Sequence, residues 1–190
     1  FLAGAVGGVG GAVRTCEMAD VQDCITVDLG GTSTDVALIY QRQPRISHDN
    51  QIDAYPLQVP QLDIHTIGAG GGSIAWVQED GTLEVGPQSA GALPGPACYG
   101  RGGTQPTISD ANLLLGRLPT ERTLSGGLSL DKAASELAFK NLAEELGGGK
   151  IDALADGVLK IAVAKMAGAV REVSVHRGFD PRDFALLGFG

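Results

Sequence analysis

Residues 28–35 read Asp-Leu-Gly-Gly-Thr-Ser-Thr-Asp, and this segment lies between two stretches with strand character. Residues 24–27 precede it and residues 36–40 come after it, and both stretches are rich in Val, Ile and other residues that favour strands. A Gly-Gly-Thr loop between two strands predicts a tight hairpin whose N–H groups and hydroxyls can close on an anion. The flanking carboxylates of Asp28 and Asp35 are suited to hold a divalent cation or to orient a water. We therefore predict a loop that binds nucleotide phosphates.

Two commoner phosphate loops are excluded by the strand pattern after the glycines. A Rossmann fingerprint or a P-loop leads from a strand through glycines into a helix, whereas a second strand is expected here. The chain also has no G-x-x-x-x-G-K-[ST] segment. The hairpin resembles the phosphate loop of the actin, Hsp70 and sugar-kinase superfamily. The alternative is an ordinary hairpin turn in which Thr and Asp are turn residues.

Composition restricts the possible partners and the compartment. The chain has 190 residues, a formal net charge of −8 and no basic cluster, so we expect no nucleic-acid partner. No apolar run approaches the roughly 20 residues that a membrane span needs, so we expect no membrane partner. The three cysteines, Cys16, Cys24 and Cys98, are odd in number and widely spaced, which favours a reducing cytoplasm over a disulfide framework.

The pattern along the chain predicts an α/β fold of ribonuclease-H-like type, because strands come first, then helices, then one more strand. We expect one domain fragment with a phosphate-loop meander over 20–48, a Gly/Pro-rich β insertion over 50–107 and a helical part with a closing strand over 108–190. The expected strands are 24–29, 34–40, 43–48, 73–77, 82–85 and 184–189, and the expected helices lie within 4–19, 109–115, 131–146 and 152–176. The chain lacks an initiating Met and stops at a glycine after a strand, so we expect an internal piece of a longer polypeptide.

A second group of residues has the chemistry of metal ligands. Asp63 and His65 point to the same side if their segment is extended, and Cys98 lies in a tight loop between Pro96 and Tyr99. One carboxylate, one imidazole and one thiolate predict a site for Zn²⁺ or another divalent transition metal. The alternative is a partly buried polar pair and an inert core cysteine.

Two further features have a functional and a structural interpretation. Gly70, Gly71, Gly72 and Ser73 predict an anion nest for a substrate carboxylate or phosphate, or else a flexible connector. Asp110 falls in the first turn of an expected helix, where the helix dipole favours a carboxylate, so we assign it a structural role.

Several segments together resemble the hydantoinase A / 5-oxoprolinase family, which includes N-methylhydantoinase A and subunits of acetone and acetophenone carboxylases. They occur in the family's order and span most of the chain. The segments are Asp28–Asp35, Asp63–Ser73, Val85–Gly91, Pro94–Gly100, Thr107–Leu113 and Arg171–Gly178 with Leu187–Gly190.

The resemblance implies an actin-like ATPase fold that uses ATP and Mg²⁺ to cleave a cyclic amide. It makes this hairpin the second of two phosphate loops, with Asp28 as the Mg²⁺ ligand and Asp35 supporting the loop or positioning water. The residues implied to bind the nucleotide phosphates are Gly30, Gly31, Thr32, Thr34, Gly188 and Gly190. A hydantoinase B-type partner subunit or domain and an oligomeric full-length protein are also implied. The alternatives are a subunit of an ATP-dependent ketone carboxylase, or an isolated lobe without activity of its own.

Overall fold

The computed structural model describes residues 3–47, 50–52, 55–57, 60–119 and 127–190. The chain divides into two compact units. The first unit comprises Phe1–Leu29, Thr34–Thr66 and Ala167–Gly190, and the second comprises Gly30–Ser33 and Ile67–Met166.

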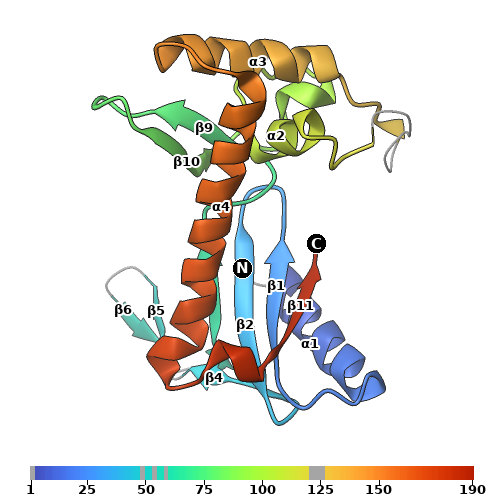
Figure 1. Cartoon of the computed structure of the whole chain (residues 1–190). Helices are drawn as coiled ribbons and strands as arrows, with labels where there is room; N and C mark the ends of the chain where they lie inside the picture. Colours follow the sequence, from blue (N-terminus) through green and yellow to red (C-terminus); the bar gives the residue numbers. More distant parts are fainter. Residues whose placement is uncertain (1–2, 48–49, 53–54, 58–59, 120–126) are drawn as a thin grey trace. The chain divides into compact units, whose positions relative to one another are not determined.

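The first unit is built on a mixed sheet (Figure 1). Its strands follow the order β11 (Ala185–Phe189), β1 (Cys24–Leu29), β2 (Thr34–Tyr40) and β3 (Gln43–Pro44), and β8 (Ile64–Ile67) pairs with β2. Strand β1 runs parallel to β11 and antiparallel to β2. The sheet confirms the predicted α/β class, and the predicted closing strand, β11, lies beside β1 at the end of this order.

Helix α1 (Ala3–Met18) covers part of this sheet with an apolar face. The residues that it shares a core with are branched or small, and the central strand positions Ile25, Val36, Leu38 and Ile39 are almost completely buried. The cluster comprises Val9, Ala12, Cys16, Cys24, Ala37 and Ile39. The thiols of Cys16 and Cys24 are free and 3.0 Å apart. Burial and the Cys16 contact raise the pKa of Cys24 to about 12.

The expected third strand over 43–48 is split in two. Strand β3 pairs with β2, whereas β4 (Ile46–Ser47) pairs with β7 (Gln61–Leu62). The chain changes partner at Arg45, whose N–H donates to Leu38 and whose carbonyl accepts from Asp63. Residue 48 lies outside the described residues. A separate two-stranded pair consists of β5 (Asn50–Ile52) and β6 (Tyr55–Leu57).

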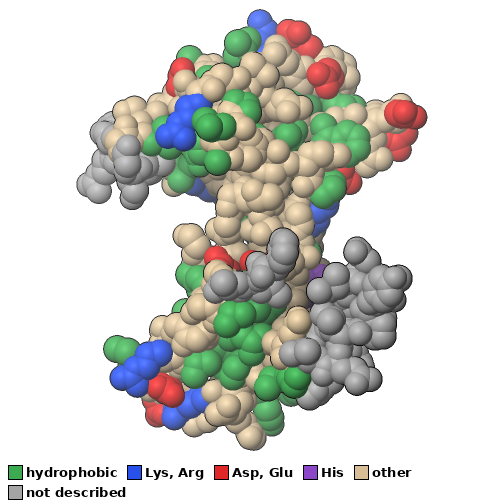
Figure 2. Space-filling model, turned by 180° about the vertical axis from the view of Figure 1, so that it is seen from behind, with side chains coloured by type: hydrophobic (Ala, Val, Ile, Leu, Met, Phe, Trp, Pro, Cys, Tyr) green, Lys and Arg blue, Asp and Glu red, His purple; other side chains and the backbone are tan. Residues whose placement is uncertain are grey.

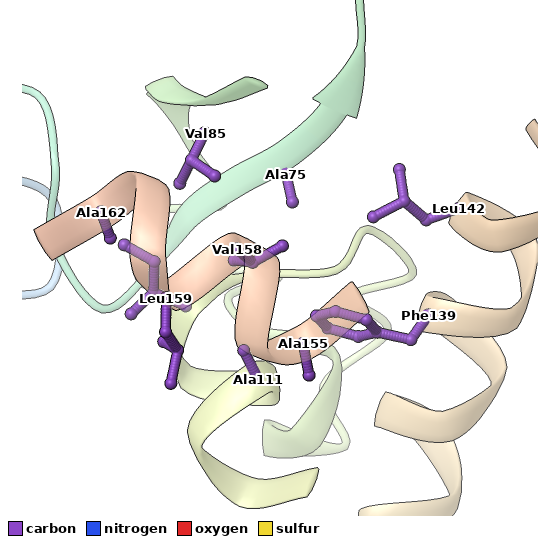
Figure 3. Packing of buried hydrophobic residues seen from close by; sticks show 10 residues of the cluster. Ala75, Val85, Ala111, Phe139, Leu142, Ala155, Val158, Leu159 and Ala162 are labelled. Atoms are coloured by element: carbon purple, nitrogen blue, oxygen red, sulfur yellow. The ribbon is translucent and has the colours of Figure 1, made fainter. Parts of the chain in front are cut away.

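The second unit packs one β-hairpin against three helices. Strands β9 (Ser73–Val77) and β10 (Leu83–Ser89) are antiparallel, and the helices are α2 (Ile108–Leu114), α3 (Lys132–Glu145) and α4 (Ile151–Val173), the last up to Met166. Their apolar faces meet in a core of small and large side chains (Figure 3). The labelled members are Ala75, Val85, Ala111, Phe139, Leu142, Ala155, Val158, Leu159 and Ala162.

Local sequence signals set the helix ends in this unit. Thr107 and Asp110 form a capping box at the start of α2, and the side chain of Asp131 accepts from Ala134 at the start of α3. Gly147 follows α3 with φ 82°. The predicted helices are confirmed with two differences. The N-cap of α2 is Thr107, so the helix begins at Ile108, before the expected range of 109–115. Helix α4 ends at Val173, and the chain continues as a 3₁₀ turn, η3 (Val175–Arg177).

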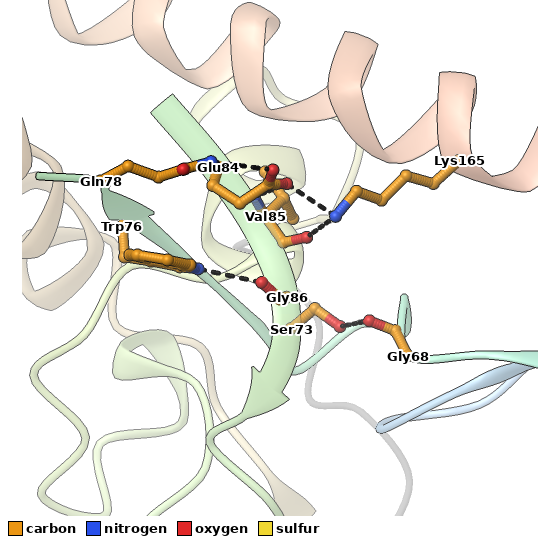
Figure 4. Close-up of polar contacts among 8 residues, drawn as sticks. All are labelled: Gly68, Ser73, Trp76, Gln78, Glu84, Val85, Gly86 and Lys165. Carbon is orange, nitrogen blue, oxygen red and sulfur yellow. Dashed lines mark hydrogen bonds and ion pairs between the residues drawn. The ribbon is translucent and has the colours of Figure 1, made fainter. Parts of the chain in front are cut away.

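One ion pair joins α4 to the β-hairpin (Figure 4). Lys165 Nζ lies 2.6 Å from Glu84 Oε1 and also donates to the carbonyl of Val85 at 2.6 Å. Hydrogen bonding from Lys165 lowers the pKa of Glu84 below its usual value. The amphipathic Lys165 side chain therefore holds the middle of α4 against β10.

Figure 2 shows Lys and Arg side chains spread over several places on the face in view, among acidic and hydrophobic ones. No helix within the described ranges is long and apolar enough to cross a membrane.

Candidate functional site

Asp28 and Asp35 are a cross-strand pair close to the turn of the β1–β2 hairpin. The strand register places them directly opposite each other, so their side chains leave the same face with Cβ atoms about 5 Å apart. Thr66 Oγ1 on β8 donates a hydrogen bond to Asp35 Oδ1 at 2.5 Å. Two partly exposed carboxylates on one face repel each other unless a cation lies between them. The donor set fits a hard cation such as Mg²⁺, which favours carboxylate oxygens.

Glycines leave room around Asp28. Strand β11 runs beside β1 with Phe189 opposite Asp28. A Cβ atom on Gly190, whose φ is 130°, would overlap the carbonyl oxygen of Leu29 and lie 2.9 Å from Asp28 Oδ1. A Cβ atom on Gly8 of α1 would lie 2.9 Å from the Phe189 ring and 3.3 Å from Asp28 Oδ2. Of the two predicted nucleotide glycines at the end of the chain, Gly190 therefore lies at Asp28.

Gly188 and Thr34 lie elsewhere on the same sheet. Gly188 is opposite Val27, and a Cβ atom there would meet nothing within 4 Å. Thr34 is opposite Leu29 and its side chain is completely buried. The carboxylate pair and Gly190 are thus the members of the predicted set that the first unit brings together.

The hairpin tip, Gly30–Ser33, belongs to the second unit. The N–H group of Gly30 donates to Ser33 O at 2.9 Å and closes the turn. Within the part of the chain that the structure describes, the N–H groups of Gly31, Thr32 and Ser33 donate to no protein acceptor. Three neighbouring backbone donors of this kind match the chemistry of an anion-binding loop.

The N–H groups of the glycine segment 70–73 are all occupied by protein oxygens. Gly71 donates to Gly30 O at 3.0 Å and Gly72 donates to Gly31 O at 2.6 Å, both on the hairpin tip. Gly70 donates to Ser73 Oγ at 2.8 Å and Ser73 donates to Gly70 O at 2.9 Å. The hydroxyl of Ser73 in turn donates to Gly68 O (Figure 4). To bind an anion as predicted, these N–H groups would first have to break their hydrogen bonds to protein oxygens.

The three predicted transition-metal ligands have separate surroundings. Asp63 Oδ1 accepts from Arg177 at 3.2 Å, and His65 is half-buried on β8. Cys98 belongs to the second unit, in the 3₁₀ turn η1 (Ala97–Tyr99), and is completely buried. Burial and the neighbouring Asp110 raise the pKa of the Cys98 thiol. No group of three or more His, Cys, Asp and Glu among the described residues could hold a metal ion, and the Zn²⁺ site stays a prediction.

Some residues at the site had no signal in the sequence that singled them out. Thr66, which holds Asp35, is one polar residue in a short strand, and Gly8 reads as one of several small residues in a helix. Ser89, whose hydroxyl lies 3.5 Å from Thr32 Oγ1 on the hairpin tip, ends a proline-containing strand. Each acts through a partner at least 20 residues away, which periodicity cannot reveal.

The mixed sheet, the covering helices and the glycine hairpin with its carboxylate pair define an α/β fold of the actin-like ATPase type. The chain matches the hydantoinase/oxoprolinase family over residues 1–190, and it belongs to this family. The resemblance predicted from the motifs is confirmed.

Relatives and solved structures agree with this assignment. The chain is 44% identical to caprolactamase subunit alpha of Pseudomonas jessenii over 170 residues, which cover 90% of this chain and 24% of the relative. A nucleotide-free structure of acetone carboxylase, from work on ATP-dependent acetone carboxylation, aligns with a TM-score of 0.86 and 31% identity, covering 97% of this chain and 26% of that one. The ATP-dependent caprolactamase of Pseudomonas jessenii aligns with a TM-score of 0.83 and 41% identity, covering 96% and 26%. The chain spans about a quarter of the length of these proteins.

Proposed function

We propose that the full-length protein containing this chain is an ATP-dependent amidohydrolase that opens hydantoin or 5-oxoproline-type cyclic amides. The observation that carries the proposal is the tip of the β1–β2 hairpin, which has three unengaged N–H groups. The strands of the same hairpin, in the first unit, carry the cross-strand carboxylates Asp28 and Asp35. Membership of the hydantoinase/oxoprolinase family and similarity to an ATP-dependent caprolactamase support the substrate class.

The chemistry requires activation because an unstrained cyclic amide is a poor electrophile. Transfer of a phosphoryl group from ATP to the amide oxygen would make the ring carbon electrophilic enough for water to add. The ring C–N bond would then break with a proton going to the nitrogen, and the resulting acyl phosphate would be hydrolysed to a carboxylate and phosphate. The N–H groups of Gly31, Thr32 and Ser33 would donate to phosphate oxygens, while Gly30 keeps the turn closed. Asp28 would bind Mg²⁺, directly or through water, and Asp35 would support the loop or position a water. Catalysis of this kind depends mainly on positioning and on stabilisation of charge.

Other elements of the proposal concern the surroundings of this site. Gly190 and Gly188 on the neighbouring strand β11 would contribute to nucleotide binding. Thr34, which is completely buried, would support the hairpin from within. We also propose a hydantoinase B-type partner subunit or domain, an oligomeric full-length protein and a cytoplasmic location. We assign no step of the reaction to a transition metal.

A second candidate function is a subunit of an ATP-dependent ketone carboxylase. It is favoured by the structural alignment with acetone carboxylase at a TM-score of 0.86. In both functions the hairpin would hold nucleotide phosphates, so the substrate distinguishes them. A third possibility is that the 190-residue chain by itself is a lobe without activity, since it spans about a quarter of its relatives.

The experiment measures ADP release by the full-length polypeptide with its partner subunit. Hydantoin, 5-oxoproline and caprolactam are supplied as cyclic amides, and acetone or acetophenone with bicarbonate as carboxylase substrates. The amidohydrolase proposal expects ADP release and ring opening with a cyclic amide. ADP release that needs a ketone and bicarbonate and does not occur with any cyclic amide would refute it. Calorimetric titration of MgATP into the isolated 190-residue chain tests whether the lobe binds nucleotide alone.

A further inference from the structure

The tip of the β1–β2 hairpin rests on the glycine segment 70–72 within the same compact unit. Two carbonyl oxygens of the tip, those of Gly30 and Gly31, accept hydrogen bonds from Gly71 and Gly72. The two segments are about 40 residues apart in sequence. The contact therefore holds the tip by two of its carbonyl oxygens and leaves its three unengaged N–H groups free to bind a ligand.

A Cβ atom added at successive glycines of the segment would point in alternating directions. A Cβ atom on Gly70 would lie 2.7 Å from three backbone atoms of the tip, Gly30 O, Ser33 N and Thr32 C. A Cβ atom on Gly72 would lie 2.9 Å from Gly31 O. A Cβ atom on Gly71 would instead lie 2.9 Å from Ser109 Oγ, and its closest tip atom would be Gly30 O at 3.9 Å. A side chain at Gly70 or Gly72 would therefore clash with the tip. The N–H group of Gly71 also contacts the tip, but its Cβ position points toward Ser109, so a methyl group there would leave the tip in place.

Ser89 adds a side-chain contact to the same surface. Its hydroxyl lies 3.5 Å from Thr32 Oγ1 and accepts a hydrogen bond from Gly91 N at 3.1 Å. Strand pairing places Ser89 opposite Ser73, directly after the glycine segment. We call Gly70, Gly72 and Ser89 the tip shelf.

We propose that the tip shelf positions the hairpin tip for phosphate binding, so that Gly70, Gly72 and Ser89 are positioning residues of the nucleotide site. This inference rests on the proposed function. Backbone donors stabilise phosphate best when they are held in place before the ligand arrives. Gly72 holds the carbonyl oxygen of Gly31, Ser89 contacts the hydroxyl of Thr32, and Gly70 lets the two backbones approach. The glycine segment then acts on the nucleotide through the tip, without itself being the anion site.

The test compares matched alanine substitutions in the full-length protein. Gly70→Ala forces the tip to move, because its new Cβ meets backbone atoms that cannot rotate away. The control is Gly71→Ala combined with Ser109→Ala, which adds the same methyl group one residue away and removes the hydroxyl that it would crowd. The readout is the Kd for MgATP and, separately, for adenosine, by calorimetry, with thermal unfolding as a check of the fold.

We expect Gly70→Ala to weaken MgATP binding about tenfold or more, as misplacement by an ångström can do. Adenosine binding should be unchanged, and the control should bind MgATP within about twofold of the wild type. A loss of stability alone would weaken both ligands. If Gly70→Ala does not fold, Ser89→Ala, which adds no atoms, should still raise the Kd for MgATP about threefold with adenosine unaffected.

Two outcomes overturn the inference by itself. One is that Gly70→Ala binds MgATP like the wild type, or that Ser89→Ala does so where Gly70→Ala does not fold. The other is that the control weakens MgATP binding as much as Gly70→Ala. If the wild-type protein binds no MgATP, the proposed function fails and the inference fails with it, so the two failures are distinguishable.

Discussion

The carboxylate of Asp110 is completely buried and accepts five hydrogen bonds from three segments. The shortest come from Cys98 N at 2.7 Å, Thr107 Oγ1 at 2.7 Å and Ser135 Oγ at 2.6 Å, and Ala97 N and Thr107 N complete the set. Asp110 therefore joins η1, α2 and α3. Its position in the first turn of a helix was predictable, but its role as a junction was not, because Cys98 and Ser135 are 12 and 25 residues away.

We predict that Asp110→Ala destabilises the second unit by about 3–5 kcal/mol. The substitution leaves buried N–H and hydroxyl donors without an acceptor, and each unsatisfied buried group costs about 1–3 kcal/mol. Hydrogen exchange of peptides from α2 and α3 in the full-length protein measures the local opening free energy.

The control for this prediction is Asp152→Ala. Asp152 also lies in the first turn of a helix, α4, but is exposed, so its removal should cost no more than the helix-dipole term of about 0.3–1 kcal/mol. Equal effects of the two substitutions would mean that Asp110 contributes only through the dipole.

Helix α1 is an element whose sequence is poor in helix-forming residues. It contains five glycines in sixteen residues, and each costs about 0.8–1.0 kcal/mol relative to alanine in a helix interior. Packing of Val9, Ala12 and Cys16 against the sheet offsets this cost. The glycines differ in their surroundings, since Gly10 has open space and Gly8 lies against Phe189 and Asp28.

We predict opposite effects of one substitution at these two glycines. Gly10→Ala should stabilise α1 by up to about 1 kcal/mol, because its Cβ meets nothing within 4 Å. Gly8→Ala should destabilise it by about 1–3 kcal/mol, because its Cβ would lie 2.9 Å from the Phe189 ring. Hydrogen exchange of α1 peptides in the full-length protein measures both changes. A stabilising effect of Gly8→Ala would show that the ring moves aside without cost.

At the scale of the whole molecule, the chain consists of two compact units, and the hairpin spans both in sequence. Its strands belong to the first unit and its tip, Gly30–Ser33, belongs to the second. The relatives are about four times as long as this chain. The carboxylate pair and the tip are thus best tested together in the full-length protein.

We predict that Asp28→Asn raises the Mg²⁺ concentration needed for half-maximal ADP release by about tenfold or more. The substitution removes the carboxylate proposed to bind Mg²⁺, directly or through water, and loss of a metal ligand or of its supporting group typically costs about 10–100-fold in metal affinity. The measurement is a Mg²⁺ titration of ADP release at saturating ATP.

His65→Ala is the matched control for the metal prediction. His65 takes no part in the proposed Mg²⁺ site, so its replacement should leave the Mg²⁺ dependence and the bound-metal content unchanged. If His65→Ala removes bound metal from the full-length protein, the assignment of no metal role to His65 is wrong. An unchanged Mg²⁺ dependence in Asp28→Asn would exclude Asp28 as a Mg²⁺ ligand.

The sequence by itself determined the β1–β2 hairpin, the β9–β10 hairpin, the main helices and the family. These features depend on short-range signals: strand patterning around Gly30-Gly31, the apolar periodicity of α3 and α4, and the glycines after α3. Each signal involves residues a few positions apart, so local propensity and turn chemistry suffice to predict it.

Only the tertiary structure decided which distant residues meet. It places Gly70 and Gly72 against the hairpin tip. It also pairs Asp63 with Arg177 in an ion pair and buries Cys98 beside Asp110. The glycine segment, predicted as an anion nest or connector, gained its contacts with the tip only through packing of chain segments about 40 residues apart. Such contacts depend on how elements pack and on which backbone groups remain to be satisfied, and no periodicity in the chain encodes them.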